Sequence, residues 1–405
     1  MPPERAGCDP AERHVNPYAR TMLPLTLDGV RMAWSRRQFM QSTALAAPTL
    51  VLARGREASA SGAFSQRAAT GGLLRLDSNE NAAGPCASAI EAITGATRLS
   101  HVYPFRFEGA LQRAIAARQG VSSSNVMVGC GSSEVLLNAV LAFTDEKRGL
   151  LAPVPTFEEP ARRARQLGRL VRDVPVRADL QVDLDAMASH VPDAGLVFLC
   201  NPNNPTSVAL PLDDVRAFVA DALRRSPDVV VLVDEAYIEY ADGAGVASAL
   251  PLALESPRVL VSRTFSKMYG MAGLRVGYAM GQPSLLERLA AWSLPMSVNT
   301  VGLHAAVAAL EDDGFEARER QRNAEARAFT VSQLSALGVR TAPSHANFVM
   351  ADVKRDTAGF RRACLEQGVA VGRPFPPLDT WSRISVGTMD EMKRACAVFG
   401  AVLRA

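Results

Sequence analysis

The sequence predicts an α/β protein built on a doubly wound, mainly parallel sheet, with a smaller α+β domain after it. Helical and strand-like patterns alternate from about Leu73 onward, as they do in chains that place helices on both faces of a sheet. Continuous apolar runs of strand length occur at 196–199, 229–233 and 259–261, and such runs suit strands that are buried on both faces. After Pro295 a long helical pattern precedes two shorter strand patterns, which indicates the second domain.

The elements follow in a regular order along the chain. In the first domain, the patterns predict a short strand at 125–128 and helices at 108–119, 132–143, 213–225 and 284–292. Ser132 and Ser133 carry hydroxyl groups that suit the start of the second of these helices. In the second domain, helical patterns over 300–336 precede strands near 346–353 and 382–386. We expect a leader over 1–70, a large domain over 101–294, and a small domain assembled from 71–100 and 295–405.

The composition is that of a globular protein with one or two large domains. The chain has 405 residues, of which 48% are hydrophobic and 21% are charged, and this excludes a disordered or fibrous protein. The formal net charge of +3 lies in the first 60 residues, so a basic surface for nucleic acid is not expected. The six cysteines form no C-x-x-C pair and the five histidines are scattered, so neither a disulfide framework nor a metal site is expected. No run of about eighteen apolar residues occurs, and no membrane-inserted helix is expected.

The leader contains a pattern typical of protein export. The sequence Ser35-Arg36-Arg37-Gln38-Phe39-Met40 precedes the uncharged stretch 41–53 and resembles a twin-arginine signal. Ala58-Ser59-Ala60 fits the small-x-small pattern that signal peptidases accept. We therefore expect export to the periplasm, with a mature protein that begins near Ser61. The alternative is a disordered extension with a chance arginine pair, in which case the protein is cytoplasmic.

Four polar clusters lie where predicted strands end, which is the edge at which α/β sheets bind ligands. They are Gly129–Glu134, Asn201–Thr206, Asp234–Tyr237 and Ser262–Lys267, the last followed by Arg275. Each cluster alone has an ordinary structural explanation, such as a turn or a helix cap. Their occurrence in this order, each at a strand end, indicates one binding site.

Together the clusters resemble those of fold-type I pyridoxal-phosphate aminotransferases, and most closely the histidinol-phosphate aminotransferase group. The resemblance covers about residues 72–400. It is carried by Leu76–Asn81, Tyr103-Pro104, Asn203–Thr206, Asp234–Tyr237, Ser266-Lys267 with Arg275, and Arg383–Thr388. It implies the fold of the type I transferases that depend on pyridoxal 5′-phosphate, this cofactor, a small-molecule amino donor with a 2-oxo acid, and a homodimer.

The resemblance assigns the catalytic chemistry to Lys267, Asp234 and Tyr237. Lys267 would hold the cofactor covalently and then move a proton between substrate and cofactor. Asp234, as a buried carboxylate, would keep the pyridine nitrogen of the cofactor protonated. Tyr237 and Asn204 would hydrogen-bond the 3′-oxygen of the cofactor. Phe157 would stack on the pyridine ring, at a position where family members often have Tyr.

The cofactor phosphate requires hydrogen-bond donors and positive charge. The residues expected to supply them are Ser132, Ser133, Thr264, Ser266 and Arg275. Free backbone amides at a helix N-terminus bind anions, and a guanidinium offers two parallel donors. In the family a tyrosine reaches this phosphate from the partner subunit, and Tyr103 matches that tyrosine. This match implies that the enzyme is a homodimer.

Three residues are expected to bind the substrate. Arg383 resembles the arginine that holds the substrate α-carboxylate, where a planar two-pronged donor is favoured. Asn79 lies in the segment that closes over the substrate in this family. Arg373 lies near the place where an arginine binds the phosphate of histidinol phosphate, although Phe375 and Trp381 equally suit a pocket for an aromatic side chain.

The predicted function is transfer of an amino group from an amino acid or amine, either histidinol phosphate or an aromatic amino acid, to a 2-oxo acid such as 2-oxoglutarate. Two alternatives stay open. One is a decarboxylase that resembles threonine-phosphate decarboxylase, which shares the scaffold. The other is a non-catalytic binding protein on the same fold, which would have no need of Lys267, Asp234 and Arg275 together. One departure from the family pattern is Ser207, which stands where Gly is usual.

Overall fold

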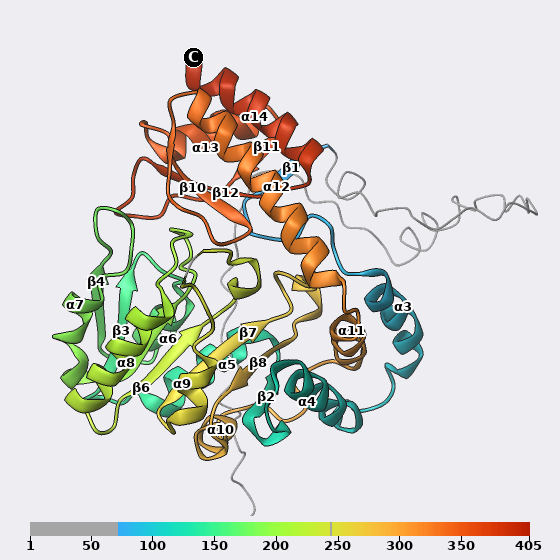
Figure 1. Ribbon diagram of the computed structural model, residues 1–405, viewed down its shortest axis with the longest axis vertical. Helices are drawn as coiled ribbons and strands as arrows, with labels where there is room; N and C mark the ends of the chain where they lie inside the picture. Colours follow the sequence, from blue (N-terminus) through green and yellow to red (C-terminus); the bar gives the residue numbers. More distant parts are fainter. Residues whose placement is uncertain (1–71, 244) are drawn as a thin grey trace, which may run out of the picture. The chain divides into compact units, whose positions relative to one another are not determined.

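The computed structural model describes residues 72–243 and 245–405, which lie within one compact unit (Figure 1). The predicted export signal, with its paired arginines and its cleavage site, lies outside the described residues. Within the described part of the chain, no helix has the length and apolar character that crossing a membrane requires.

A seven-stranded sheet forms the centre of the larger half of this unit. In spatial order its strands are β2 (Val126–Gly129), β8 (Gly277–Met280), β7 (Val259–Thr264), β6 (Val230–Asp234), β5 (Ala194–Cys200), β3 (Gly149–Val154) and β4 (Val171–Pro175). The pairs from β7 to β4 are parallel, whereas β8 is antiparallel to both of its neighbours. The prediction of a mainly parallel sheet is confirmed.

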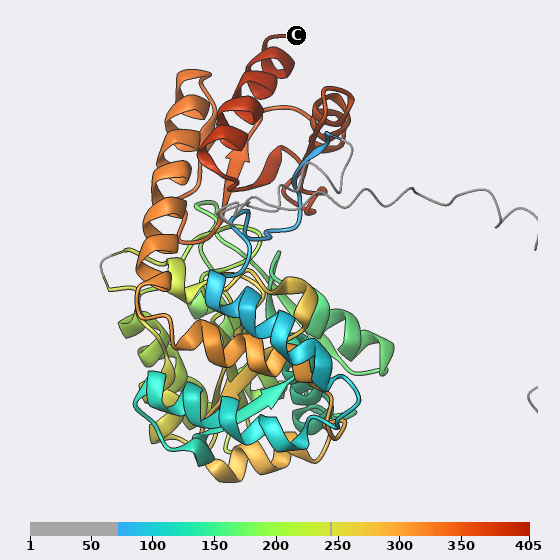
Figure 2. The same ribbon diagram turned by 90° about the vertical axis from the view of Figure 1, so that its right-hand side faces the viewer.

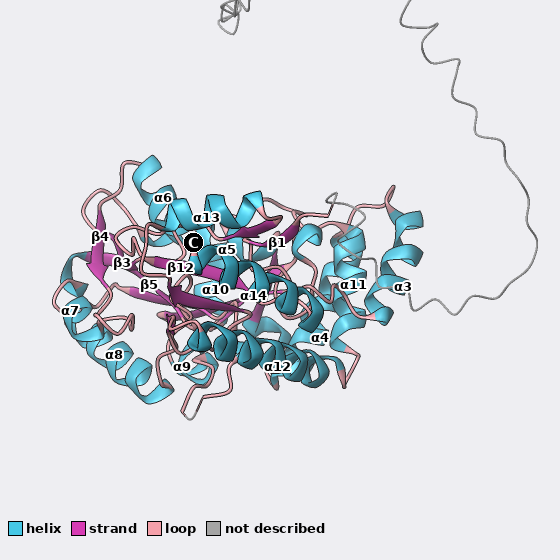
Figure 3. Cartoon of the chain, turned by 90° about the horizontal axis from the view of Figure 1, so that it is seen from above, coloured by secondary structure: helices cyan, strands magenta, loops and turns pink. Residues whose placement is uncertain are grey.

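Helices cover both faces of this sheet (Figure 3). One face packs on α5 (Gly131–Phe143), α6 (Glu159–Gln166) and α10 (Pro283–Ala290). The other side carries α4 (Phe105–Gln119), α7 (Leu184–Ala188), α8 (Leu212–Arg225) and α9 (Leu250–Glu255), with α11 (Thr300–Leu310) packed on α4 and α3 (Ala87–Ala96) packed on α11. Side chains alternate between the two faces along each strand, so Leu232 packs toward α5 while Val231 and Val233 pack on the opposite face. The fully apolar strands of the sequence are therefore buried on both sides, and the doubly wound arrangement is confirmed.

The remaining strands form two small sheets with a separate hydrophobic core. One is the antiparallel sheet β12 (Trp381–Ser385), β10 (Phe348–Asp352) and β9 (Arg340–Thr341). In the other, β1 (Leu74–Leu76) pairs in parallel with β11 (Val369–Val371). The helices of this part are α12 (Phe315–Ala336), α13 (Thr357–Glu366) and α14 (Met389–Arg404), which Figure 2 shows beside the small sheets. The boundaries at residues 100 and 295 stay a prediction.

Candidate active site

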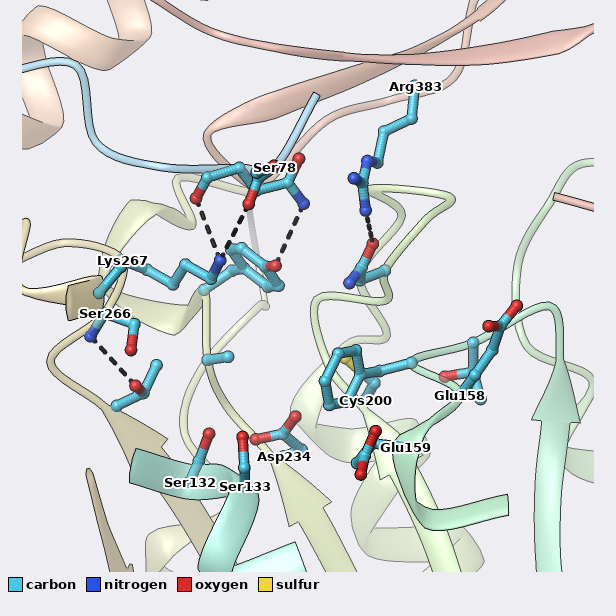
Figure 4. A pocket seen from close by; sticks show the side chains of 18 of the residues that line it. Ser78, Ser132, Ser133, Glu158, Glu159, Cys200, Asp234, Ser266, Lys267 and Arg383 are labelled. Carbon is cyan, nitrogen blue, oxygen red and sulfur yellow. Dashed lines mark hydrogen bonds between the residues drawn. The ribbon is translucent and has the colours of Figure 1, made fainter. Parts of the chain in front are cut away.

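A cavity of about 440 Å³ opens at the carboxyl ends of the parallel strands. It is bordered by the ends of β5, β6 and β7, the start of α5, the segment after β1 and the loop after β11 (Figure 4). Every predicted site residue except Tyr103 lines it, namely Asn79, Ser132, Ser133, Phe157, Asn204, Asp234, Tyr237, Thr264, Ser266, Lys267, Arg275, Arg373 and Arg383. The structure thus brings together residues that are far apart in the sequence, and their individual roles stay predictions.

Lys267 lies just after β7, with its amine inside the cavity. Its Nζ donates hydrogen bonds to the backbone oxygens of Asn79 at 3.1 Å and Ser78 at 3.4 Å. Burial lowers the pKa of this amine to about 8, and the positive charges of Arg383 and Arg275 act in the same direction. A lower pKa leaves more of the amine neutral near pH 7, which is the form that attacks a carbonyl or accepts a proton.

Asp234 ends β6 and lies on the floor of the cavity. Burial raises the pKa of this carboxyl to about 6, and Glu235 acts in the same direction. A hydrogen bond of 2.6 Å from Ser262 Oγ and the charge of Lys267 oppose the increase. A protonated ring nitrogen beside Asp234 would favour the ionised carboxylate further. The environment therefore suits a cationic partner such as a pyridinium.

Tyr237 remains a neutral hydrogen-bond donor in this site. Its side chain is buried, and the burial raises the pKa of the phenol far above its usual value. Its hydroxyl accepts a hydrogen bond from Asn79 Nδ2 at 3.2 Å, which leaves the O–H proton to be donated elsewhere. This donor suits an oxygen on a bound ring.

The start of α5 and Arg275 form a cradle for an anion. Arg275 donates to Ser266 Oγ and to Ser133 Oγ, each at 3.3 Å. A Cβ atom at Gly131 would lie 2.4 Å from Arg275 Nη2, and one at Gly277 would lie 2.2 Å from the backbone nitrogen of Ser132. Only glycine permits this close approach. The guanidinium and the first amides of the helix meet here, and this donor set fits the phosphate of pyridoxal phosphate.

Arg383 is held firmly at the upper side of the cavity (Figure 4). It is buried, and it donates from Nη1 to Asn204 Oδ1 at 2.7 Å and from Nη2 to the backbone oxygen of Asp77 at 2.6 Å. Among the described residues its Nε has no hydrogen-bond partner. Burial lowers its pKa, and a bound anion would offset that cost.

Arg373 and Arg383 share one aromatic platform. The guanidinium carbons of Arg373 and Arg383 lie 4.3 Å and 4.9 Å from the centre of the Phe375 ring. Arg373 also pairs with Glu158 at 2.5 Å. Trp381 does not line the cavity, and it packs instead under Arg340, whose guanidinium carbon lies 5.0 Å from the ring centre. Of the two aromatic residues considered for the pocket, only Phe375 shapes it.

Several cavity residues carried no clear signal in the sequence. They are Thr156, Glu158, Glu159, Arg162, Cys200 and Ala272. Glu158 and Glu159 follow β3, which contains Pro153 and is followed by Pro155. Proline inside an apolar run argues against a central strand, so this strand end, and the acidic pair after it, escaped notice.

Tyr103 and Ser207 differ from the other predicted positions. Tyr103 is 71% exposed and lies outside the cavity, in a depression that it shares with Met296 and Thr300. The site within one chain therefore lacks this tyrosine. Ser207 adopts a φ of +65° in a buried position, a backbone conformation that explains why glycine suits it better. Its Oγ donates to the backbone oxygen of Pro343 at 3.2 Å, so the change to serine is accommodated.

No group of three or more His, Cys, Asp or Glu side chains within 72–243 and 245–405 is arranged to hold a metal ion. The donors present in the cavity, which are the Arg275 guanidinium and the first amides of α5, suit an anion such as a phosphate.

Comparisons with known proteins agree with this donor set. The family described as aminotransferase class I and II matches residues 72–399. The chain is 39% identical over 337 residues to histidinol-phosphate aminotransferase 2 of Ralstonia nicotianae, which covers 82% of this chain and 89% of that protein. It is 37% identical over 337 residues to the histidinol-phosphate aminotransferase of an Anaeromyxobacter species, and this match covers 82% of this chain and 92% of that protein. The solved structure of histidinol-phosphate aminotransferase from Sinorhizobium meliloti in complex with pyridoxal-5′-phosphate has a TM-score of 0.76, 26% identity, and coverage of 86% of this chain and 96% of that one.

Proposed function

We propose a substrate pair for this chain, which belongs to the class I and II aminotransferases and is an enzyme that uses pyridoxal phosphate. The proposed amino donor is histidinol phosphate, and the proposed acceptor is a 2-oxo acid such as 2-oxoglutarate. The observation that carries the choice of donor is the Phe375 platform, which places Arg373 and Arg383 together at one end of the cavity. Two guanidinium groups favour a substrate with a phosphate over one with an apolar side chain. The names of the related enzymes support the same choice.

Each of several cavity residues has a separate role in the proposed reaction. Pyridoxal phosphate, when bound, supplies the electron sink for the substrate carbon that carries the amine. With the cofactor bound, Lys267 would move the proton between that carbon and the C4′ atom of the cofactor. Asp234 would keep a proton on the pyridine nitrogen of the cofactor, and Tyr237 would donate a hydrogen bond to the 3′-oxygen of the cofactor. Arg383 orients the anionic group of the substrate.

A screen of amino donors tests the proposed substrate. With 2-oxoglutarate as acceptor, we expect kcat/KM for histidinol phosphate to exceed that for phenylalanine or aspartate by roughly 100-fold, because charge-assisted hydrogen bonds to the phosphate contribute about 1.5–3 kcal/mol each. Arg373→Gln should raise KM for histidinol phosphate about tenfold. Arg340→Gln is the matched control, since it removes a guanidinium that stacks on Trp381 outside the cavity. A preference for phenylalanine would replace this proposal with an aromatic aminotransferase.

We also propose that the enzyme is a homodimer in which Tyr103 donates to the cofactor phosphate of the neighbouring subunit. The support is that Tyr103 and Met296 are exposed and line one depression, and that Phe105, Trp292 and Leu294, which are close to them in sequence, are exposed large apolar residues as well. Exposed apolar groups of this size are typical of association surfaces. Leu294 is also near the anion cradle, because its backbone nitrogen donates to Glu134 in the first turn of α5.

The predicted effect of Tyr103→Phe is a modest loss of cofactor affinity. Removing one hydrogen bond of about 1 kcal/mol should raise the dissociation constant of pyridoxal phosphate about fivefold. The ring remains, so sedimentation velocity should still show a dimer. Tyr269→Phe is the control, because the Tyr269 hydroxyl bonds Glu316 within the same chain. A fully active monomer at assay concentration would refute the dimer.

We further propose that the protein is exported in a folded state through the twin-arginine route. The support is physical as well as sequence-based, since the groups proposed to bind the cofactor come from several strand ends that meet only after folding. Replacing Arg36 and Arg37 with Lys should leave the precursor in the cytoplasm with unchanged specific activity. Replacing Arg54 and Arg56 with Lys in the same leader is the matched control, and it should leave export intact. Wild-type protein found wholly in the cytoplasm with residues 35–60 still attached would overturn this proposal.

A further inference from the structure

Two consecutive residues of β7 donate hydrogen bonds to the two consecutive carboxylates at the end of β6. In the strand register Ser262 lies opposite Asp234, and Ser262 Oγ donates to Asp234 Oδ1 at 2.6 Å. Arg263 Nε donates to Glu235 Oε2 at 3.0 Å, and Arg263 Nη2 forms an ion pair with the same oxygen at 2.9 Å. All four side chains are buried. Each carboxylate therefore has its own partner from the neighbouring strand.

The two carboxylates have different surroundings. Glu235 is fully engaged, because it also accepts hydrogen bonds from Ser248 Oγ at 2.8 Å and from the backbone nitrogen of Ala249 at 2.6 Å. Asp234 lines the cavity, where it is proposed to meet the cofactor. The hydrogen bond from Ser262 occupies Oδ1 and leaves Oδ2 for a ligand. A hydroxyl that donates to a carboxylate stabilises the ionised form and fixes its plane.

We propose that Ser262 is a positioning residue for the reaction, whose hydrogen bond orients the Asp234 carboxylate and keeps it ionised against the pyridine nitrogen of the cofactor. This inference rests on the role proposed for Asp234. Ser262 does not line the cavity, so it acts only through Asp234. Other titratable groups also interact with the charge of Asp234. They are Glu235, Lys267, Cys200 and Tyr237, and all four residues remain present when only Ser262 is substituted.

The test follows the visible absorbance of the holoenzyme as the pH is varied. In Ser262→Ala the carboxylate loses a charge-assisted hydrogen bond, which should raise the pKa of Asp234 by about one unit. The ring nitrogen then carries less positive charge. Because this charge disfavours a proton on the lysine nitrogen that holds the cofactor, the pKa of that nitrogen rises. The spectral midpoint is the pH at which half of the change in visible absorbance has occurred. We therefore expect this midpoint to rise by about half a pH unit or more. We also expect kcat to fall about tenfold while KM for the donor changes less than twofold.

Three further variants make the result decisive. Thr144→Val is the matched control, because it removes another buried hydroxyl that donates at 2.6 Å, here to Val140 at the far end of α5. It should leave the spectrum and kcat unchanged. Ser262→Cys keeps the size of the side chain but donates weakly, and its midpoint should fall between those of serine and alanine. Asp234→Asn should shift the midpoint further than Ser262→Ala does.

Each outcome has a clear meaning. A shift in Asp234→Asn with none in Ser262→Ala or Ser262→Cys would overturn the role of Ser262 and leave that of Asp234 in place. No shift in Asp234→Asn would overturn the proposed role of Asp234 itself. If Ser262→Ala does not fold, as judged by circular dichroism, the cysteine variant decides, since a wild-type midpoint there would refute the inference.

Discussion

Lys267→Ala is expected to abolish transamination and to remove the visible absorbance that a lysine-bound cofactor gives. Lys267 is half-buried and is the only lysine among the residues that line the cavity, and alanine provides neither the covalent attachment nor the proton carrier. We expect kcat to fall by at least about 1,000-fold, by the order of magnitude that the loss of covalent and acid–base catalysis together implies. Activity assays and absorbance spectra of the purified variant measure both effects.

Lys393→Ala is the matched control for this experiment. Lys393 is exposed and pairs with Asp390 on α14, so its loss should leave the spectrum and kcat unchanged. Visible absorbance retained by Lys267→Ala, together with normal turnover, would show that another amine holds the cofactor.

Arg275→Gln is expected to have the second largest effect, on cofactor affinity. Arg275 supplies the positive charge of the anion cradle and donates toward Ser133 and Ser266 on its two sides. Losing charge-assisted hydrogen bonds of about 1.5–3 kcal/mol to a phosphate should raise the dissociation constant of pyridoxal phosphate by roughly 100-fold. The measurement is a titration of the apoprotein with pyridoxal phosphate, followed by fluorescence.

The same titration applied to Arg216→Gln provides the control, because Arg216 is exposed and pairs with Glu255 away from the cavity. Equal cofactor affinity in the Arg275 variant and in the wild type would mean that the phosphate binds elsewhere.

Much of the large sheet could be predicted because its strands have a simple physical signature. The run at 229–233 is wholly apolar because β6 is buried on both faces, and the acidic residue Asp234 marks where the strand meets the cavity. The polar clusters at the strand ends then coincide in space because parallel strands end at one edge. The roles expected of Lys267 and Arg275 came from the family resemblance and from the spacing between these two residues.

Other features depend on contacts that no local pattern records. The pairing of β1 with β11 joins segments almost the whole described chain apart, and neither segment is long enough to show a period. The helix predicted at 108–119 begins three residues earlier, at Phe105, directly after Pro104. Ser262 belongs to a polar cluster that the sequence shows, but its contact with Asp234 depends on the strand register, which only the folded sheet defines.

Reduction of the holoenzyme with borohydride, followed by peptide mapping by mass spectrometry, tests the central claim most directly. The reagent fixes the cofactor to whichever lysine holds it. A single adduct on Lys267 is the result that this site requires, since its amine lies in the cavity with Asp234 and the anion cradle. An adduct on any other lysine, with Lys267 unmodified, would contradict the assignment of this cavity as the active site.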